Sequence, residues 1–168
     1  KWDFQYHANF IGSSIEKVVL EKKLIDSLIG KETEIARAHQ YHLPDLKLLK
    51  DYFKADSSYD NWTKLTLFKP FMTDLGIIEF PHFPEIEFIN LYRNKGDNIK
   101  KLYNDIIDIG RKTNGLIVVL THPTPFKKWG KTIQEFFITQ DGFKIKTMHQ
   151  VMEDLRKKYK IDYTPKFS

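Results

Sequence analysis

The chain has 168 residues, of which 41% are hydrophobic, and it contains no cysteine. This size suits a single compact domain over residues 1–168, and the lack of cysteine excludes both a disulfide framework and a thiolate zinc site. The net charge of +5 comes from basic pairs spread along the chain. Because no basic block is present, we expect no nucleic-acid partner.

Neither a membrane span nor a signal peptide is visible in the sequence. The chain opens at Lys1 directly in a strand-like pattern, so we expect that upstream sequence has been removed. Localisation is therefore left open, with the cytoplasm favoured. Residues 160–168 are expected to form a loosely packed tail.

Short apolar runs alternate with helical patterns from one end of the chain to the other. We expect strands near residues 2–7, 33–39, 52–56, 76–80, 115–121 and 142–146. We expect helices over residues 13–30, 44–49, 98–111, 132–138 and 147–159, and a short helix plus loop over 61–74. This alternation predicts an α/β fold with a parallel sheet, open or closed into a barrel, and helices outside it.

Two helix-capping positions and one apolar run support these assignments. Ser13 and Glu16 form a capping-box pattern before one helix, and Gly30 closes it. The run Gly115–Pro123, GLIVVLTHP, is typical of a strand that is buried on both faces of a parallel sheet.

Histidines and an aspartate lie where predicted strands end, which is where α/β proteins place their sites. These residues are His7, His39, Asp56 and His122. Arg37 and His39 are two residues apart, so they point to one face of their strand. Any one of these histidines could be structural, but their equivalent positions favour a shared site. Imidazole and carboxylate donors suit zinc or a similar divalent ion, which predicts a hydrolytic metal site.

A succession of short motifs resembles the polysaccharide deacetylases of the NodB-homology fold. The motifs are HANF (His7–Phe10), ARAH (Ala36–His39), DSS (Asp56–Ser58) with Trp62 nearby, IIEFP (Ile77–Pro81) and GLIVVLTHP. Their order is similar to that in the branch from bacterial surface-polysaccharide biosynthesis. The resemblance implies a distorted (β/α) barrel, a divalent metal such as zinc, and hydrolysis of an N-acyl group on a carbohydrate substrate.

The resemblance also implies roles for individual residues. His7 would bind the metal, Arg37 would position the catalytic carboxylate, Asp56 would be the acidic residue of the next motif, and His122 would be the general acid. Substrate contacts are expected from Asn9, Trp62, His82 and Glu85.

The chain departs from the family pattern in two places. The family's first strand, which carries two catalytic aspartates, has no counterpart here, so we expect a barrel that is incomplete at its N-terminus. The second metal histidine would fall at Ile11, and His39 is our candidate to replace it. Residues 1–168 alone should then be inactive unless a carboxylate such as Glu79 or Glu85 takes over.

Three interpretations stay open at this point. The chain is most of a metal-dependent sugar amide hydrolase, or a non-catalytic relative that binds sugars in the same pocket, or another α/β domain with structural histidines. Unpaired strand edges predict self-association, so a homo-oligomer is also left open.

Overall fold

The computed structural model describes residues 5–8, 14–38, 49–58, 69–82, 99–113, 115–118, 130–131, 134–135 and 142–160. The chain divides into two compact units. The first unit contains Lys1–Tyr59, Pro70–Phe80 and Ile145–Ser168, and the second contains Asp60–Lys69 and Pro81–Lys144. Each unit is described by itself below.

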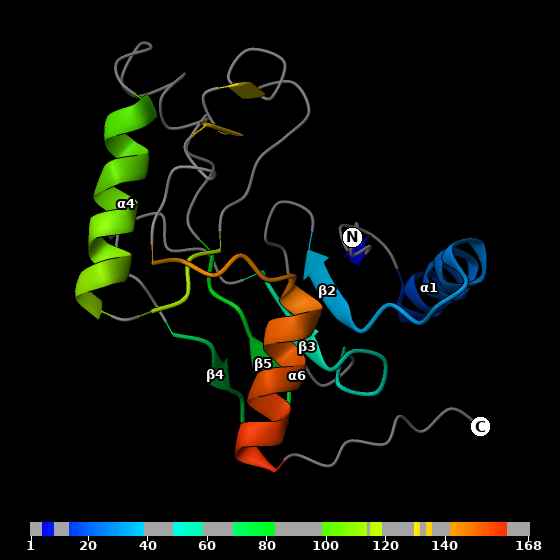
Figure 1. The fold of residues 1–168 in the computed structure, drawn as a ribbon. Coiled ribbons are helices and arrows are strands. Elements are labelled where there is room, and N and C mark those ends of the chain that lie inside the picture. The colour runs from blue at the N-terminus through cyan, green and yellow to red at the C-terminus, as the bar shows by residue number, and fades with distance from the viewer. Residues whose placement is uncertain are drawn as a thin grey trace. The chain divides into compact units, whose positions relative to one another are not determined.

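The first unit is built on a five-stranded sheet in the order β1-β2-β3-β5-β4 (Figure 1). The strands are β1 (Tyr6–Ala8), β2 (Ile35–Ala38), β3 (Ala55–Asp56), β4 (Phe71–Met72) and β5 (Ile78–Glu79). Neighbouring strands are parallel except for β4, which is antiparallel to β5. The predicted parallel α/β sheet is thus confirmed for β1, β2, β3 and β5, although the sheet is mixed. As far as the described residues go the sheet is open, and the closed barrel stays a prediction.

Strand β4 was not expected from the sequence, which predicts a helix and loop up to residue 74. A tight turn joins it to β5: the Thr73 N–H donates to the Ile77 carbonyl at 2.9 Å, and the Gly76 N–H donates to the Thr73 carbonyl at 3.0 Å. Gly76 has a φ of +79°, which glycine adopts without steric cost. Phe71 and Met72 are exposed, so β4 has no buried face whose alternation would reveal it.

Helix α1 (Ile15–Ile29) begins and ends close to the predicted positions. Its N-cap is Ser14, one residue after the predicted Ser13, and the Ser14 hydroxyl accepts a hydrogen bond from the Lys17 N–H at 3.4 Å. Gly30 ends the helix in the left-handed conformation, as its sequence position predicts. The helix packs on the sheet through an apolar core. That core consists of Tyr6, Val18, Ala36, Ala38, Leu49, Phe53 and Ile77, with Ile15, Ile25 and Tyr52 packed against it.

Asp26 joins α1 to the segment before β2, through an ion pair with Lys22 of the same helix and hydrogen bonds from Thr33. Lys22 is buried and donates to Asp26 Oδ2 at 2.5 Å, and Lys22 Nζ also lies 5.6 Å from the centre of the Phe53 ring. The other Asp26 oxygen accepts from the Thr33 N–H and hydroxyl, both at 2.7 Å. Burial alone would raise the pKa of Asp26, but the hydrogen bonds from Lys22 and Thr33 lower it below its ordinary value.

Two further helices agree with the sequence. In the second unit, α4 (Ile99–Thr113) covers the predicted segment, and Ile106 and Ile107 are buried. In the first unit, α6 (Met148–Tyr159) starts with the complete capping box of Thr147 and Gln150. Residues 134–135 are helical, as predicted, and residues 130–131, which precede the predicted helix, are helical too. Residues 44–48 lie outside the described part of the chain. None of the helices that the structure describes is long and apolar enough to cross a membrane.

Two predicted strands are wrong for the residues that the structure describes. Residues 115–118 and 142–146 form no strand, while 119–121 lie outside the described residues. A continuous apolar run cannot by itself be told from another buried segment, and here Ile117 packs against α4. A Cβ atom at Gly110 would lie 2.6 Å from Ile117 Cδ1, which leaves room only for glycine unless Ile117 moves. In the other segment Ile145 is 78% exposed, so the apolar and polar alternation does not create a buried face.

Candidate functional site

The carboxyl end of the sheet brings His7 and Arg37 side by side. The two residues are register partners on the parallel strands β1 and β2. Residues paired in this way point to the same face of the sheet. His7 is exposed, whereas Arg37 is partly buried and one of its terminal nitrogens is buried.

A second pair of polar residues lies on the parallel strands β3 and β5 of the same sheet. Asp56 on β3 and Glu79 on β5 are register partners, and both are buried. The two side chains share a hydrogen bond, and two carboxyl groups can do so only when one of them carries a proton. Burial raises the pKa of Asp56 above its ordinary value, and hydrogen bonds from Ser58, Glu79 and the Ser57 backbone offset part of that rise.

Two serines fasten this carboxyl pair to the adjoining strand ends. Asp56 accepts from the Ser58 N–H at 2.9 Å and from its hydroxyl at 2.8 Å, and the Ser58 hydroxyl oxygen accepts from the Ala38 N–H at 2.8 Å. The Ser57 hydroxyl donates to the Phe80 carbonyl at 3.0 Å. The DSS motif therefore satisfies the backbone at the ends of β2, β3 and β5, which fixes their relative positions.

The register separates the two pairs. Tyr6, Ala36, Asp56 and Glu79 are successive register partners, and His7 and Arg37 occupy the next position of their strands. Because successive residues of a strand point to opposite faces, His7 and Arg37 project away from the face of Asp56 and Glu79. The structure thus brings His7 to Arg37 and Asp56 to Glu79, and it does not gather all four on one face.

Of the other predicted site residues, the structure describes only His82. His82 is buried just after β5, in the second unit. Asn9, His39, Trp62, Glu85 and His122 lie outside the described residues. Their predicted roles in metal binding, substrate contact and acid catalysis therefore stay predictions.

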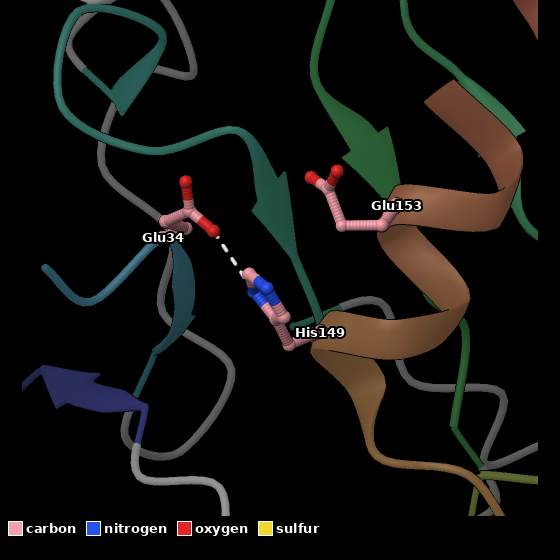
Figure 2. A group of neighbouring side chains, drawn as sticks. All are labelled: Glu34, His149 and Glu153. Atoms are coloured by element: carbon pink, nitrogen blue, oxygen red, sulfur yellow. Dashed lines mark ion pairs between the residues drawn. The ribbon is translucent and has the colours of Figure 1, made fainter. Parts of the chain in front are cut away.

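One cluster of metal-ligating side chains was missed by the sequence analysis. Glu34, His149 and Glu153 each offer a ligand atom, and these atoms all lie within 4.8 Å of one another (Figure 2). Glu34 directly precedes β2, so the cluster lies at the amino end of that strand, and the predicted site is at the carboxyl end. The only signal in the sequence is the His-x-x-x-Glu spacing of His149 and Glu153, which puts both on one helix face. Their pairing with Glu34 is a tertiary contact.

The donor chemistry of these two places differs. One imidazole and two carboxylates form a donor set that suits zinc or another first-row divalent ion, and the Glu34 cluster supplies that set. At the carboxyl end of the sheet, His7 is the one predicted metal ligand that lies among the described residues.

No protein-family model matches the sequence, and no curated protein matches it significantly. A search of solved structures finds a crystal structure from Mycobacterium smegmatis that is provisionally described as a polysaccharide deacetylase. The TM-score is 0.69 and the sequence identity is 17%, with 98% of this chain and 65% of that chain covered. The present chain thus spans a little under two thirds of the length of its structural neighbour. The likeness shows that this chain has the α/β fold of that deacetylase-like protein.

Proposed function

We propose that this chain carries a deacetylase-like hydrolase site that removes an N-acyl group from a sugar or a polysaccharide precursor. The observation that supports this most is the fold likeness over 98% of the chain, together with His7 and Arg37 in register at the carboxyl ends of β1 and β2. Folds of this kind place their chemistry at that end of the sheet. The surface-polysaccharide branch, with an amino sugar as substrate, remains part of the proposal.

The chemistry of amide hydrolysis determines which catalytic groups the site needs. Hydrolysis adds the oxygen of one water molecule to the amide carbonyl carbon and breaks the C–N bond, so the acyl group leaves as a carboxylate and the amine takes a proton. His122 is proposed to supply that proton as the general acid. Arg37 would hold a carboxylate that accepts the proton of the attacking water.

A divalent ion would be held by His7 together with His39. When bound, such an ion supplies charge that polarises the amide carbonyl. Asn9, Trp62, His82 and Glu85 are proposed to contact the sugar. Asp56 is fully buried, at 0% exposure, which favours a positioning role through Ser58 and Glu79 over direct contact with the substrate.

One observation favours a second candidate function, a sugar-binding protein without hydrolytic activity. The position that corresponds to the family's second metal histidine is Ile11, and isoleucine cannot bind a metal. A protein with this function would bind the same carbohydrate without hydrolysing it.

Acetate release from an N-acetylated amino-sugar oligosaccharide, with the full-length protein and added zinc or cobalt, tests the proposal. His122→Ala should lower kcat by roughly 100- to 10,000-fold with metal content unchanged, because it removes a positioned acid. His7→Ala should lower metal content and activity together. Sugar binding by calorimetry without any acetate release in the natural protein would contradict the hydrolase and favour the sugar-binding candidate.

Two arginine variants provide a matched control. Arg37→Lys keeps the charge but loses the planar fork that orients a carboxylate, so kcat should fall roughly 100-fold. Arg111→Lys makes the same change on α4, where Arg111 is half exposed and lies 3.7 Å from Asp108. Equal activity of the two variants would remove Arg37 from the mechanism.

A further inference from the structure

We propose that Glu34, His149 and Glu153 form a structural site for a divalent cation of the zinc or cobalt type, which fastens α6 to the amino end of β2. The site does not depend on the proposed hydrolase function. Its ligand atoms, one imidazole nitrogen and two carboxylate oxygens, lie within 4.8 Å of one another. A fourth position would be filled by water, since His149 is 43% exposed.

Hydrogen bonds to both the N–H group and the carbonyl group of Glu34 fix the position of its backbone. Gln5 Oε1 accepts from the N–H groups of Glu34 and Ile35, at 3.2 and 3.0 Å. The Glu34 carbonyl accepts from the N–H groups of Lys54 and Ala55, at 2.8 and 3.2 Å. These contacts join β1, β2 and β3 at their amino ends, so the Glu34 side chain starts from a fixed position. A prearranged ligand lowers the ordering cost of binding.

The two oxygens of the Glu34 carboxylate have different partners. Lys54 bonds Oε1, while Oε2 lies 2.8 Å from His149 Nδ1. Lys54 therefore fixes the rotation of the carboxylate and leaves Oε2 directed at α6. Figure 2 shows this ion pair as a dashed line, with His149 pointing from the helix towards Glu34.

Helix α6 presents its two ligands in a defined way. His149 and Glu153 are four residues apart, so they lie one above the other on the same helix face. The capping box at Thr147 fixes the first turn: the Thr147 hydroxyl accepts from the Gln150 N–H at 3.2 Å, and Gln150 Oε1 accepts from the Thr147 N–H at 3.0 Å. Met152, next to Glu153, is fully buried and anchors the helix.

Charge and geometry both favour a dication at this point. Glu34 and Glu153 carry two negative charges against the single positive charge of Lys54, so the cluster has an excess of negative charge that attracts a cation. With metal–ligand bonds of about 2.0–2.2 Å, ligand atoms of a tetrahedral zinc site lie about 3.3 Å apart. The 2.8 Å separation of His149 Nδ1 and Glu34 Oε2 must open slightly, and Glu153 must close in from at most 4.8 Å.

A protonated His149 paired with Glu34 is the competing explanation, and Glu153 discriminates between the two. The ion pair requires only His149 and Glu34, whereas the cation site needs Glu153 as its third ligand. The position at the amino ends of the strands argues for a structural cation, because that end of a barrel-like fold serves stability.

Glu153→Gln and Asp154→Asn form the test and its matched control, since each removes one carboxylate from the same turn of α6. Asp154 pairs with Lys146 and does not belong to the cluster. With zinc at about 100 times its Kd, the natural protein should gain roughly 5–10 °C in Tm. Asp154→Asn should keep this gain, while Glu153→Gln and His149→Ala should bind at least about tenfold more weakly.

Cobalt absorption and zinc calorimetry locate the ion independently of enzymatic activity. His7→Ala should keep the Glu153-dependent signal, which separates this site from the metal of the proposed hydrolase. No zinc-dependent rise in Tm in the natural protein, or an equal rise in Glu153→Gln and Asp154→Asn, would overturn the proposal.

Discussion

At the scale of single residues, the carboxyl pair of Asp56 and Glu79 makes the stability of the fold depend on pH. Asp56 is fully buried, and burial raises its pKa in the folded protein. A carboxyl group whose folded pKa is raised contributes stability that is fully present below its unfolded pKa and is lost as pH rises through the folded pKa. The pair therefore lowers the free energy of unfolding as pH rises.

Asp56→Asn should remove this dependence. The Asn oxygen still accepts from the Ser58 N–H, and its NH2 group can donate to Glu79 and to the Ser58 hydroxyl, which can accept as well as donate. The variant should gain stability relative to the natural protein as pH rises above 3.8, the ordinary value for Asp. Urea unfolding across a pH series measures the difference, with Asp51→Asn, an exposed position in the same segment, as the control. A constant difference at every pH would contradict the prediction.

At the scale of elements, the ion pair of Lys22 and Asp26 decides how α1 is joined to β2. Lys22 is buried, and Asp26 joins it to Thr33 just before the strand. Removing one partner of a buried pair leaves an uncompensated charge. The sign of its pH effect is opposite to that of Asp56. Because the folded pKa of Asp26 is lowered, its stabilisation is present above 3.8 and is lost as pH falls through the folded value.

Asp26→Asn should lower the free energy of unfolding by about 3 kcal/mol at neutral pH. The loss is at the low end of the usual range because Glu32 Oε1 remains 3.7 Å from Lys22 Nζ. Asp108→Asn, which removes an exposed carboxylate 3.7 Å from Arg111, should cost only a few tenths of a kcal/mol. Chemical denaturation of both variants checks this contrast, and similar losses would show that burial of Lys22 is unimportant.

At the scale of the whole molecule, ion pairs between basic and acidic side chains recur along the part of the chain that the structure describes. The pairs are Lys17–Glu21, Lys22–Asp26, Lys54–Glu34, Lys101–Asp105, Arg111–Asp108, Lys131–Glu135 and Lys146–Asp154. A phosphate backbone is bound by clustered lysine and arginine side chains that release counterions. Each of these pairs offsets one positive charge, although the net charge is +5 and the last turn of α6 carries Arg156, Lys157 and Lys158.

Binding to a random DNA duplex should therefore be no tighter than the non-specific range, with a Kd of roughly 10⁻⁴ M or weaker at physiological salt. Fluorescence anisotropy over a salt series measures this. Sub-micromolar binding with a steep salt dependence would contradict the prediction and point to a basic surface that the pairs do not neutralise.

The sequence alone determined the features that depend on local chemistry. The end of α1 at Gly30 and the start of α6 at Thr147 follow from residues that act within one turn, and α1 starts one residue after the predicted cap Ser13. The parallel order of β1, β2 and β3 follows from strands alternating with helices. The motif order resembling the deacetylases predicted a fold that the structural neighbour shares at only 17% identity.

Only the tertiary structure decided the features that depend on pairing between distant segments. Register placed Asp56 opposite Glu79 and His7 opposite Arg37, and it put the two pairs on different faces, which a single strand cannot reveal. It also decided that residues 115–118 form no strand, because an apolar run shows that a segment is buried and not what it pairs with. Glu34 and His149 are 115 positions apart in the numbering, and no local pattern links them; packing of α6 near the start of β2 brought them to 2.8 Å.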